Sequence, residues 1–296
     1  METLAARALT ADWLNAWLAA IGITALTGDI ELSWTDSPIP HAVLHSDRGT
    51  VIDRIVESFP DVEALECLAI ARVHPDCPDG AELQRNVTPS SYSERAELVR
   101  AERGSDFSLA ATVTDLDEDA GAHSPFDPPM PRGITIGQRL VSCRKLIDDE
   151  SLPEAIERTL VRGGTRHQNN GLGFDYRRIP SPTDPHGDVF VDPVVEVLAF
   201  HGLALLPIRG NGRRSRTRGL TASAFRPGSL TWPAWRRSLN YAAIDALLDR
   251  FWAADGAGRD GLAPDSFVVK FESLAYQPRG KMDQTRGLAS RQMSSR

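Results

Sequence analysis

The sequence predicts an α+β fold, a mixed fold with short antiparallel strands and several helices. Three observations favour it. Trp13, Trp17 and Ile21 recur at helical spacing, which predicts a helix with a buried face near the N-terminus. Ser151–Glu154 predicts a capping box with proline inside the first turn of a helix, and Asp192-Pro193 repeats the start signal. Short runs of strand-forming residues lie between the helical segments and are bounded by turn residues.

The individual elements follow in chain order from these signals. Glycine and proline delimit the short strand-like runs, and Pro60 separates two helical segments. We expect strands at 23–26, 30–34, 42–45, 203–208 and 267–271, and a hairpin within 220–232. We expect helices at 11–21, with Thr10 as cap and Gly22 as end, and at 50–59, 61–72, 151–162, 193–201 and 241–252.

Charge is distributed unevenly along the chain. Residues 1–130 hold 8 basic residues against 23 acidic ones, a net charge of −15. Residues 131–296 hold 25 against 17, a net charge of +8, and the two values give the −7 of the whole chain. We expect an acidic α/β lobe over 1–130, a basic α+β lobe over 131–276 and a flexible basic tail over 277–296. A long insertion within one domain is the alternative to two lobes.

The composition of the chain also indicates where the protein is located and what kind of partner it binds. The three cysteines are irregularly spaced, so the sequence indicates no disulfide framework. No apolar run approaches the ~20 residues of a membrane helix, and the N-terminus lacks the features of a secretion signal. We therefore expect a cytoplasmic protein with no membrane contact. The basic half indicates a polyanionic partner.

Catalytic motifs are not found in the sequence. It has neither the G-x-x-x-x-G-K-[ST] phosphate loop nor the Gly-x-Ser-x-Gly elbow. His41 and His45 lack the intervening Glu of a zincin. We therefore expect no enzymatic activity, no metal and no cofactor. The alternative is a metal-dependent nuclease, because carboxylates and a histidine can hold a divalent ion. Its candidate ligands are Asp184, His186, Asp188 and Asp192, although a turn-rich loop with Asp192 as a helix cap explains the same residues.

Two arginine-rich segments give the strongest functional signal. One runs from Arg209 to Arg218, and the other from Arg162 to Arg178. Arginine forks match phosphate oxygens, and aromatic rings or guanidinium planes stack on unpaired bases. The predicted nucleic-acid-binding residues are Arg162, Arg166, Arg177, Arg178, Arg209, Arg213, Arg214, Arg216, Arg218, Trp232, Arg236 and Arg237. The alternative is that both segments are solvated surface loops and that Trp232 belongs to the core.

Several apolar and glycine-based motifs resemble the accessory subunits of type I-G (formerly I-U) CRISPR systems. They are GLGFDY at 171–176, DPVVEVLAFHGL at 192–203 and LTWPAW at 230–235, with WLAAIG at 17–22 followed by LSW at 32–34. The similarity covers about half of the chain, in pieces. It indicates either a large-subunit-like protein or a protein related to the extension of the helicase-nuclease.

The resemblance implies a Cascade subunit in antiviral defence, with crRNA, target DNA and sibling CRISPR effector subunits as partners. In such complexes base pairing reads the sequence, and the proteins contact the backbone and the flanking motif. No helicase or nuclease motif of the family's motor protein occurs here, so unwinding is not implied. The acidic first half of the chain does not fit a direct role in reading DNA, unless this half faces other subunits. A pure protein-interaction scaffold, whose charge complements a neighbour, is the remaining alternative.

Overall fold

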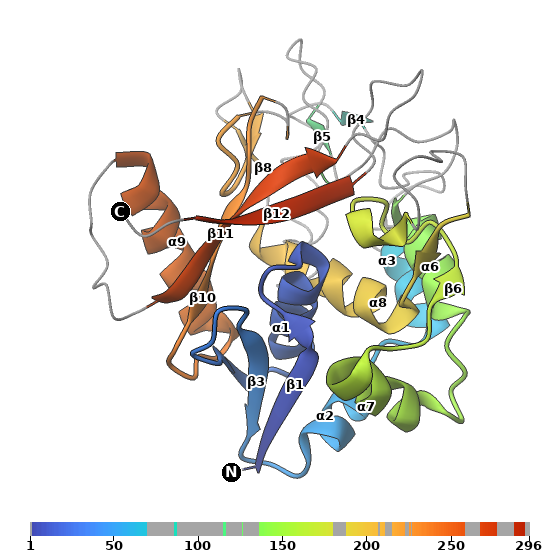
Figure 1. Ribbon diagram of the computed structural model, residues 1–296. Helices are drawn as coiled ribbons and strands as arrows, with labels where there is room; N and C mark the ends of the chain where they lie inside the picture. The colour runs from blue at the N-terminus through green and yellow to red at the C-terminus, as the bar shows by residue number, and fades with distance from the viewer. Residues whose placement is uncertain are drawn as a thin grey trace.

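Two helices from opposite halves of the chain, α1 (Leu14–Thr27) and α8 (Pro193–Gly202), cross at the centre of the computed structural model (Figure 1). Nearly every side chain of both helices is buried, as their almost uninterrupted apolar sequences require. The structure describes residues 2–69, 86–87, 115–116, 126, 136–179, 188–206, 208–210, 215–222, 225, 227–257, 267–276 and 287–293.

Glycines allow the two central helices to approach backbone to backbone. A Cβ atom at Gly22 would lie 1.8 Å from the Leu198 carbonyl oxygen, and one at Gly202 would lie 2.1 Å from the Leu18 carbonyl oxygen. Each helix therefore contributes one glycine to the contact. The close packing of α1 on α8 joins the first and the second half of the chain in one core.

A three-stranded antiparallel sheet lies beside α1 in the order β1-β3-β2. Its strands are β1 (Glu2–Thr10), β2 (Glu31–Trp34) and β3 (His41–Ser46). A second antiparallel sheet has the order β10-β11-β12, with strands β10 (Thr231–Trp235), β11 (Phe267–Tyr276) and β12 (Gly287–Met293). The Leu32–Leu239 bridge joins the first sheet to the segment that follows β10.

Buried tryptophans fasten the second sheet to the N-terminal half. The Trp17 Nε1 atom donates to the Pro233 carbonyl at 2.9 Å, and the Trp232 Nε1 atom donates to the Ala11 carbonyl at 2.8 Å. Trp235 donates in the same way to the Leu32 carbonyl at 2.9 Å. Each indole thus buries a large apolar surface and also satisfies its N–H group.

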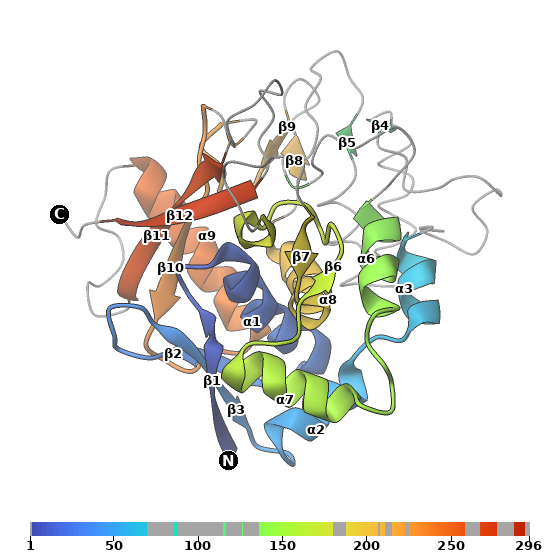
Figure 2. The ribbon, with the colours of Figure 1, turned by 45° about the vertical axis from the view of Figure 1, so that its right-hand side comes forward.

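The remaining helices cover the outside of the core. They are α2 (Val51–Ser58), α3 (Val62–Ala69), α6 (Ile136–Arg144), α7 (Leu152–Arg162) and α9 (Tyr241–Ala257). Figure 2 shows α7 along β1 and α2, and α6 beside α3. Short paired strands complete the described structure: β4 (Asn86–Val87), β5 (Asp115–Leu116), β6 (His167–Gln168), β7 (Phe190–Val191), β8 (Ile208–Gly210) and β9 (Ser215–Thr217).

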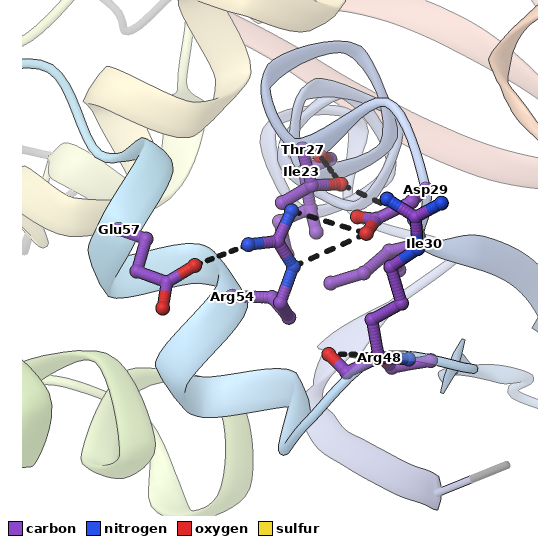
Figure 3. A network of polar contacts seen from close by, with 8 residues as sticks. Ile23, Thr27, Asp29, Ile30, Arg48, Arg54 and Glu57 are labelled. Carbon is purple, nitrogen blue, oxygen red and sulfur yellow. Dashed lines mark hydrogen bonds and ion pairs between the residues drawn. The ribbon is translucent and has the colours of Figure 1, made fainter.

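A polar network holds α2 against the end of α1 (Figure 3). The Arg54 side chain donates to Asp29, which follows the left-handed Gly28 cap of α1, and it also pairs with Glu57 one turn further along α2. Thr50 caps the start of α2 by accepting from the Asp53 N–H at 3.1 Å. The network fixes α2 and the capped end of α1 relative to one another and has a structural role.

The predicted α+β class is confirmed, whereas several predictions of local structure are wrong. The predicted strand at 203–208 is not formed as such, since Leu203–Leu205 make a 3-10 turn and β8 begins at Ile208. The predicted cap Thr10 is the last residue of β1, and Trp13 precedes α1. Residues 23–26 continue α1 instead of forming a strand, and the helix ends at Gly28. Residues 287–293 of the predicted flexible tail form β12, because they pair with β11 over seven positions. The predicted boundary near residue 130 does not separate two cores in the described part of the chain, since α1 packs on α8.

Candidate nucleic-acid interface

The loop between β6 and the 3-10 turn at Tyr176–Arg178 presents the best-defined candidate site. Gly171 and Gly173 have positive φ angles of 56° and 94°, a backbone region that glycine enters without strain. A Cβ atom at Gly171 would lie 2.6 Å from a carboxylate oxygen of Glu196. The glycines of the GLGFDY motif therefore let this loop turn tightly over α8.

Two buried carboxyl groups hold the loop from below. Glu196 of α8 accepts from the Leu172 N–H at 2.6 Å and from the Asn15 amide at 2.9 Å. Asp175 accepts from the Arg177 N–H at 2.8 Å and from the Trp13 indole at 3.0 Å. The start of α1, the loop and α8 are thereby connected through carboxyl groups that are 2 % exposed or less.

Burial changes the acidity of both groups. Burial raises the pKa of Asp175, while hydrogen bonds from Arg177 and Trp13 act in the opposite direction. Burial and the neighbouring charge of Asp175 raise the pKa of Glu196 to about 8, against the attraction of Arg178. A pKa of about 8 favours the protonated form of Glu196 at neutral pH.

Above these carboxyl groups, cationic and aromatic side chains gather at the surface. The Arg177 guanidinium lies over the Trp13 ring, 4.6 Å from its centroid, and 3.6 Å from the Asp12 carboxylate. The exposed Arg166 reaches the same place, since its Nη2 atom donates to the Arg177 carbonyl at 2.5 Å. We call Trp13, Arg166, Tyr176 and Arg177 the Arg–Trp patch. Such a set can contact phosphate oxygens and stack on bases.

Three predicted nucleic-acid-binding residues are buried, and their assignment to an exposed binding surface is wrong. Trp232 is 0 % exposed and lies in the core, as the alternative interpretation had it. Arg178 is 7 % exposed, donates to Asn170 at 3.3 Å and faces Glu196. Arg218 is 7 % exposed as well. A buried guanidinium with protein partners is not available to a phosphate.

Arg218 instead fastens the region after β9 to α9. Its guanidinium donates to the Asp249 carboxylate at 2.9 Å, to the Asp245 carboxylate at 2.5 Å and to the Leu205 carbonyl at 2.9 Å. It also lies 5.2 Å from the Trp252 ring centroid. Partners from α9 and from the turn at Leu203–Leu205 explain why this arginine is buried while its charge remains satisfied.

The other predicted arginines divide into four groups. Arg162, at the end of α7, and Arg237 are exposed. Arg236 is 40 % exposed and pairs with Asp36 of the first half at 3.3 Å. Arg209 and Arg216 are opposite one another in the β8–β9 hairpin. Arg213 and Arg214, in the connection between these strands, lie outside the described residues.

Sequence reasoning missed the residues that organise the site. Trp13 was assigned to a buried helix face, whereas it precedes α1 and supports Arg177. Glu196 was passed over because the segment around it is apolar. A single carboxylate in the middle of an apolar helix was the available signal, since a buried charge requires partners. Asn15 gave no signal, because its partner lies 181 residues away.

One candidate metal ligand of the nuclease alternative has a structural role instead. Asp192 is the N-cap of α8: it accepts from the Val194 N–H at 3.0 Å and from the Thr159 hydroxyl at 3.0 Å. Asp188 accepts from Gln168 at 2.7 Å, and Asp184 and His186 lie outside the described residues. Within the part that the structure describes, no group of three or more His, Cys, Asp or Glu side chains is arranged to hold a metal ion.

A serine–histidine contact occurs on the outer face of the first sheet. The Ser33 hydroxyl lies 2.9 Å from His45 Nε2, and His45 Nδ1 lies 3.3 Å from the Thr3 hydroxyl. In a hydrolase the second nitrogen faces a carboxylate, which stabilises the imidazolium that forms during the reaction. The threonine hydroxyl carries no such charge, so this contact is not arranged as a catalytic triad.

No protein-family model, no curated protein and no solved structure matches this chain. None of the helices that the structure describes is long and apolar enough to cross a membrane.

Proposed function

We propose that this protein is a non-catalytic, cytoplasmic subunit of a type I-G CRISPR antiviral effector complex, and that it binds crRNA or target DNA together with sibling subunits. The observation that carries the nucleic-acid part is the Arg–Trp patch. It brings Arg166 and Arg177 together at the surface beside two aromatic rings, and the Asp12 carboxylate forms an ion pair with Arg177. The family part rests on the resemblance of the motifs.

The motifs that carry the resemblance come together in the folded chain, which supports interpreting them as one set of related motifs. WLAAIG belongs to α1, DPVVEVLAFHGL contains α8, and LTWPAW contains β10. GLGFDY lies over α8, forms the loop that supports the patch and contributes Tyr176 to it. Motifs that are far apart in the chain therefore build the centre of the fold and the support of the candidate interface.

The β8–β9 hairpin supports the same function by a separate route. Arg209 and Arg216 are opposite one another in the backbone register of this antiparallel pair, and Arg213 and Arg214 stand between them in the sequence. Guanidinium groups bind phosphate oxygens. A two-stranded ribbon also has the dimensions of an element that enters the major groove. We therefore include the hairpin in the proposed nucleic-acid contact.

Replacing Arg166 and Arg177 together with alanine is expected to weaken the binding of single-stranded RNA or DNA about tenfold or more. The slope of log affinity against log salt should also decrease by about one to two, because each arginine that neutralises a phosphate contributes about 0.7. Fluorescence anisotropy between 50 and 300 mM salt measures both quantities.

The matched control for this pair is Arg250→Ala, which removes one exposed arginine from α9. It should leave both the affinity and the salt slope close to those of the unchanged protein. If the double variant binds as tightly and with the same slope as the control, the Arg–Trp patch is not a nucleic-acid contact. Retention of sibling subunits with loss of nucleic acid after nuclease treatment would favour the scaffold function instead.

The hairpin is tested by replacing Arg213, Arg214 and Arg216 with alanine while Arg218 is kept. We expect weaker binding and a salt slope smaller by about two, with an unchanged thermal midpoint. Keeping Arg218 is essential, because its guanidinium holds α9 and its loss would lower affinity through unfolding. An unchanged affinity and salt slope in the triple variant would exclude the hairpin from the contact.

A further inference from the structure

We propose that the Arg–Trp patch holds an unpaired nucleotide: its base stacks on the Arg177 guanidinium, which itself lies over the Trp13 ring, and its phosphate binds Arg166. The inference rests on the proposed function and deepens it, because each arginine takes a different part of the nucleotide. It identifies the ligand of the patch as a single strand, since the bases that stack on guanidinium planes are unpaired ones.

One side of the Arg177 guanidinium is covered, and part of the side chain is open to solvent. Its Cζ atom lies over the Trp13 ring, 4.6 Å from the centroid, and 6.0 Å from the centroid of the Tyr176 ring. The side chain of Arg177 is 33 % exposed. Because Trp13 covers one side of the guanidinium, a base can reach it from the sides that face away from this ring. Arg177 then forms the middle layer of a stack of indole ring, guanidinium and base.

The guanidinium of Arg177 also keeps its hydrogen-bonding capacity. No residue in the described part of the chain accepts a hydrogen bond from it. Its ion pair with Asp12 has a distance of 3.6 Å between Nη2 and Oδ2, which is longer than a hydrogen bond. Arg218 differs, since its guanidinium donates to carboxylates of α9. The packing of Arg177 therefore leaves its donors available to a ligand.

Asp12 favours a base over a phosphate at this position. Its carboxylate is 30 % exposed and lies beside the guanidinium, so a phosphate placed on Arg177 would meet a like charge. A neutral base meets no such repulsion, and its π-system is attracted to the cation. The planar shape of Arg177 is therefore expected to contribute to binding beyond its charge.

Arg166 is placed to bind the phosphate of the same nucleotide. It is exposed, and its Nη2 atom donates to the Arg177 carbonyl at 2.5 Å and to the Phe190 carbonyl at 2.9 Å. These bonds fix the guanidinium beside Arg177 and use one of its nitrogens, so Nε and Nη1 can donate to phosphate oxygens. Within the described residues, no carboxylate forms an ion pair with Arg166. Its charge is therefore not neutralised as that of Arg177 is.

The C-terminal strand β12 holds the patch in this arrangement. The Ser290 hydroxyl donates to the Asp12 carbonyl. A Cβ atom at Gly287 would lie 2.5 Å from the Cα atom of Tyr176, so the strand packs directly on the backbone next to Arg177. Both segments that carry the patch are thereby fixed to one strand. A surface that is ordered before binding loses less entropy when a base stacks on it.

The experiment compares two labelled single strands of equal length and equal number of phosphates, one with its bases and one with abasic sites throughout. Fluorescence anisotropy at constant salt measures the two affinities. The unchanged protein should bind the strand with bases about tenfold tighter, which corresponds to one stacked base. The pair is prepared both as DNA and as RNA, and the preference should occur in the type of strand that binds tighter.

Arg177→Lys isolates the stack, because lysine keeps the charge but has no planar group. This variant should bind the two strands equally, while the slope of log affinity against log salt stays unchanged. Its thermal midpoint should also stay unchanged, since the hydrogen bonds that hold this segment use the backbone of Arg177. The matched control Arg250→Lys, at an exposed position of α9, should retain the preference for bases.

Arg166→Ala should have the opposite effect. The preference for bases should persist, and the salt slope should decrease by about 0.7, the contribution of one phosphate contact in a single strand. A salt slope that does not change in Arg166→Ala overturns the assignment of the phosphate to this residue.

The outcomes separate this inference from the proposed function. If the unchanged protein binds both strands equally and in a salt-dependent way, the proposed function is supported and the stack on Arg177 is overturned. A preference for bases that persists in Arg177→Lys overturns the stack as well. A protein that binds neither strand overturns the proposed function and the inference with it.

Discussion

Replacing Gly202 with alanine is expected to lower the free energy of unfolding by about 3 kcal/mol or more. In an ordinary helix the same substitution stabilises by about 1 kcal/mol. Here the added Cβ atom would lie 2.1 Å from the Leu18 carbonyl oxygen of α1. Backbone atoms cannot rotate away as a side chain can, so α1 and α8 have to separate. Chemical denaturation with urea measures the change.

The matched control is Gly28→Ala at the end of α1. Gly28 has a φ of 72°, and a Cβ atom there would meet nothing within 4 Å. Its substitution should cost about 1 kcal/mol, from backbone strain alone. A cost at Gly202 that equals or falls below the cost at Gly28 would contradict the close crossing of α1 and α8.

The second large effect is expected for Arg218→Ala, which should destabilise the protein by about 2–4 kcal/mol. The substitution removes charge-assisted hydrogen bonds to Asp245 and Asp249, leaves the Leu205 carbonyl without this donor, and exposes the Trp252 ring. Because the two carboxylates are about half exposed, water replaces part of the lost interaction. This places the cost below that of a fully buried pair.

Arg218→Lys separates charge from geometry. Lysine keeps the positive charge but lacks the planar fork that reaches α9 and the Leu205 carbonyl at once, so we expect an intermediate loss in thermal midpoint. Arg250→Ala, on the exposed side of α9, should be nearly neutral. A midpoint of Arg218→Ala that matches that of Arg250→Ala would mean that Arg218 is a surface residue after all.

The part of the fold that could be predicted from sequence is the part that local chemistry determines. The signals at Ser151–Glu154 and Asp192 predict the starts of α7 and α8 correctly, because proline in the first turn and, for α8, a capping carboxylate act within a few residues. The capping box itself is wrong, since the Ser151 side chain makes no cap hydrogen bond. The helix expected at 50–59 is formed as α2, with Thr50 as its N-cap. Such signals do not depend on the rest of the chain.

The elements that were missed depend on partners far away in sequence. β1 forms by pairing with β3, about 40 residues later in the chain. The register of the pair shifts between Ala6 and Thr10, which interrupts the alternation of buried and exposed residues by which a strand is predicted. β12 contains the exposed polar residues Arg291 and Gln292, so its composition resembles a tail. Residues 23–26 contain strand formers, yet packing against α8 keeps them helical.

The candidate site could be predicted only in part for a related reason. Arg177 and Arg218 look alike in sequence, since both stand in arginine-rich segments. One lies at the surface beside Trp13, and the other is buried by carboxylates 27 and 31 residues further along. A count of arginines predicts a cationic surface but not which guanidinium groups remain available to a phosphate.

Photochemical cross-linking of the full chain to single-stranded RNA carrying 4-thiouridine, and to DNA carrying bromodeoxyuridine, tests the proposed nucleic-acid interface most directly. Mass spectrometry of the cross-linked peptides should locate adducts at Trp13 or Tyr176, and these adducts should disappear in the Arg166→Ala, Arg177→Ala double variant. Adducts confined to other surfaces, or unchanged adducts in the double variant, would contradict it.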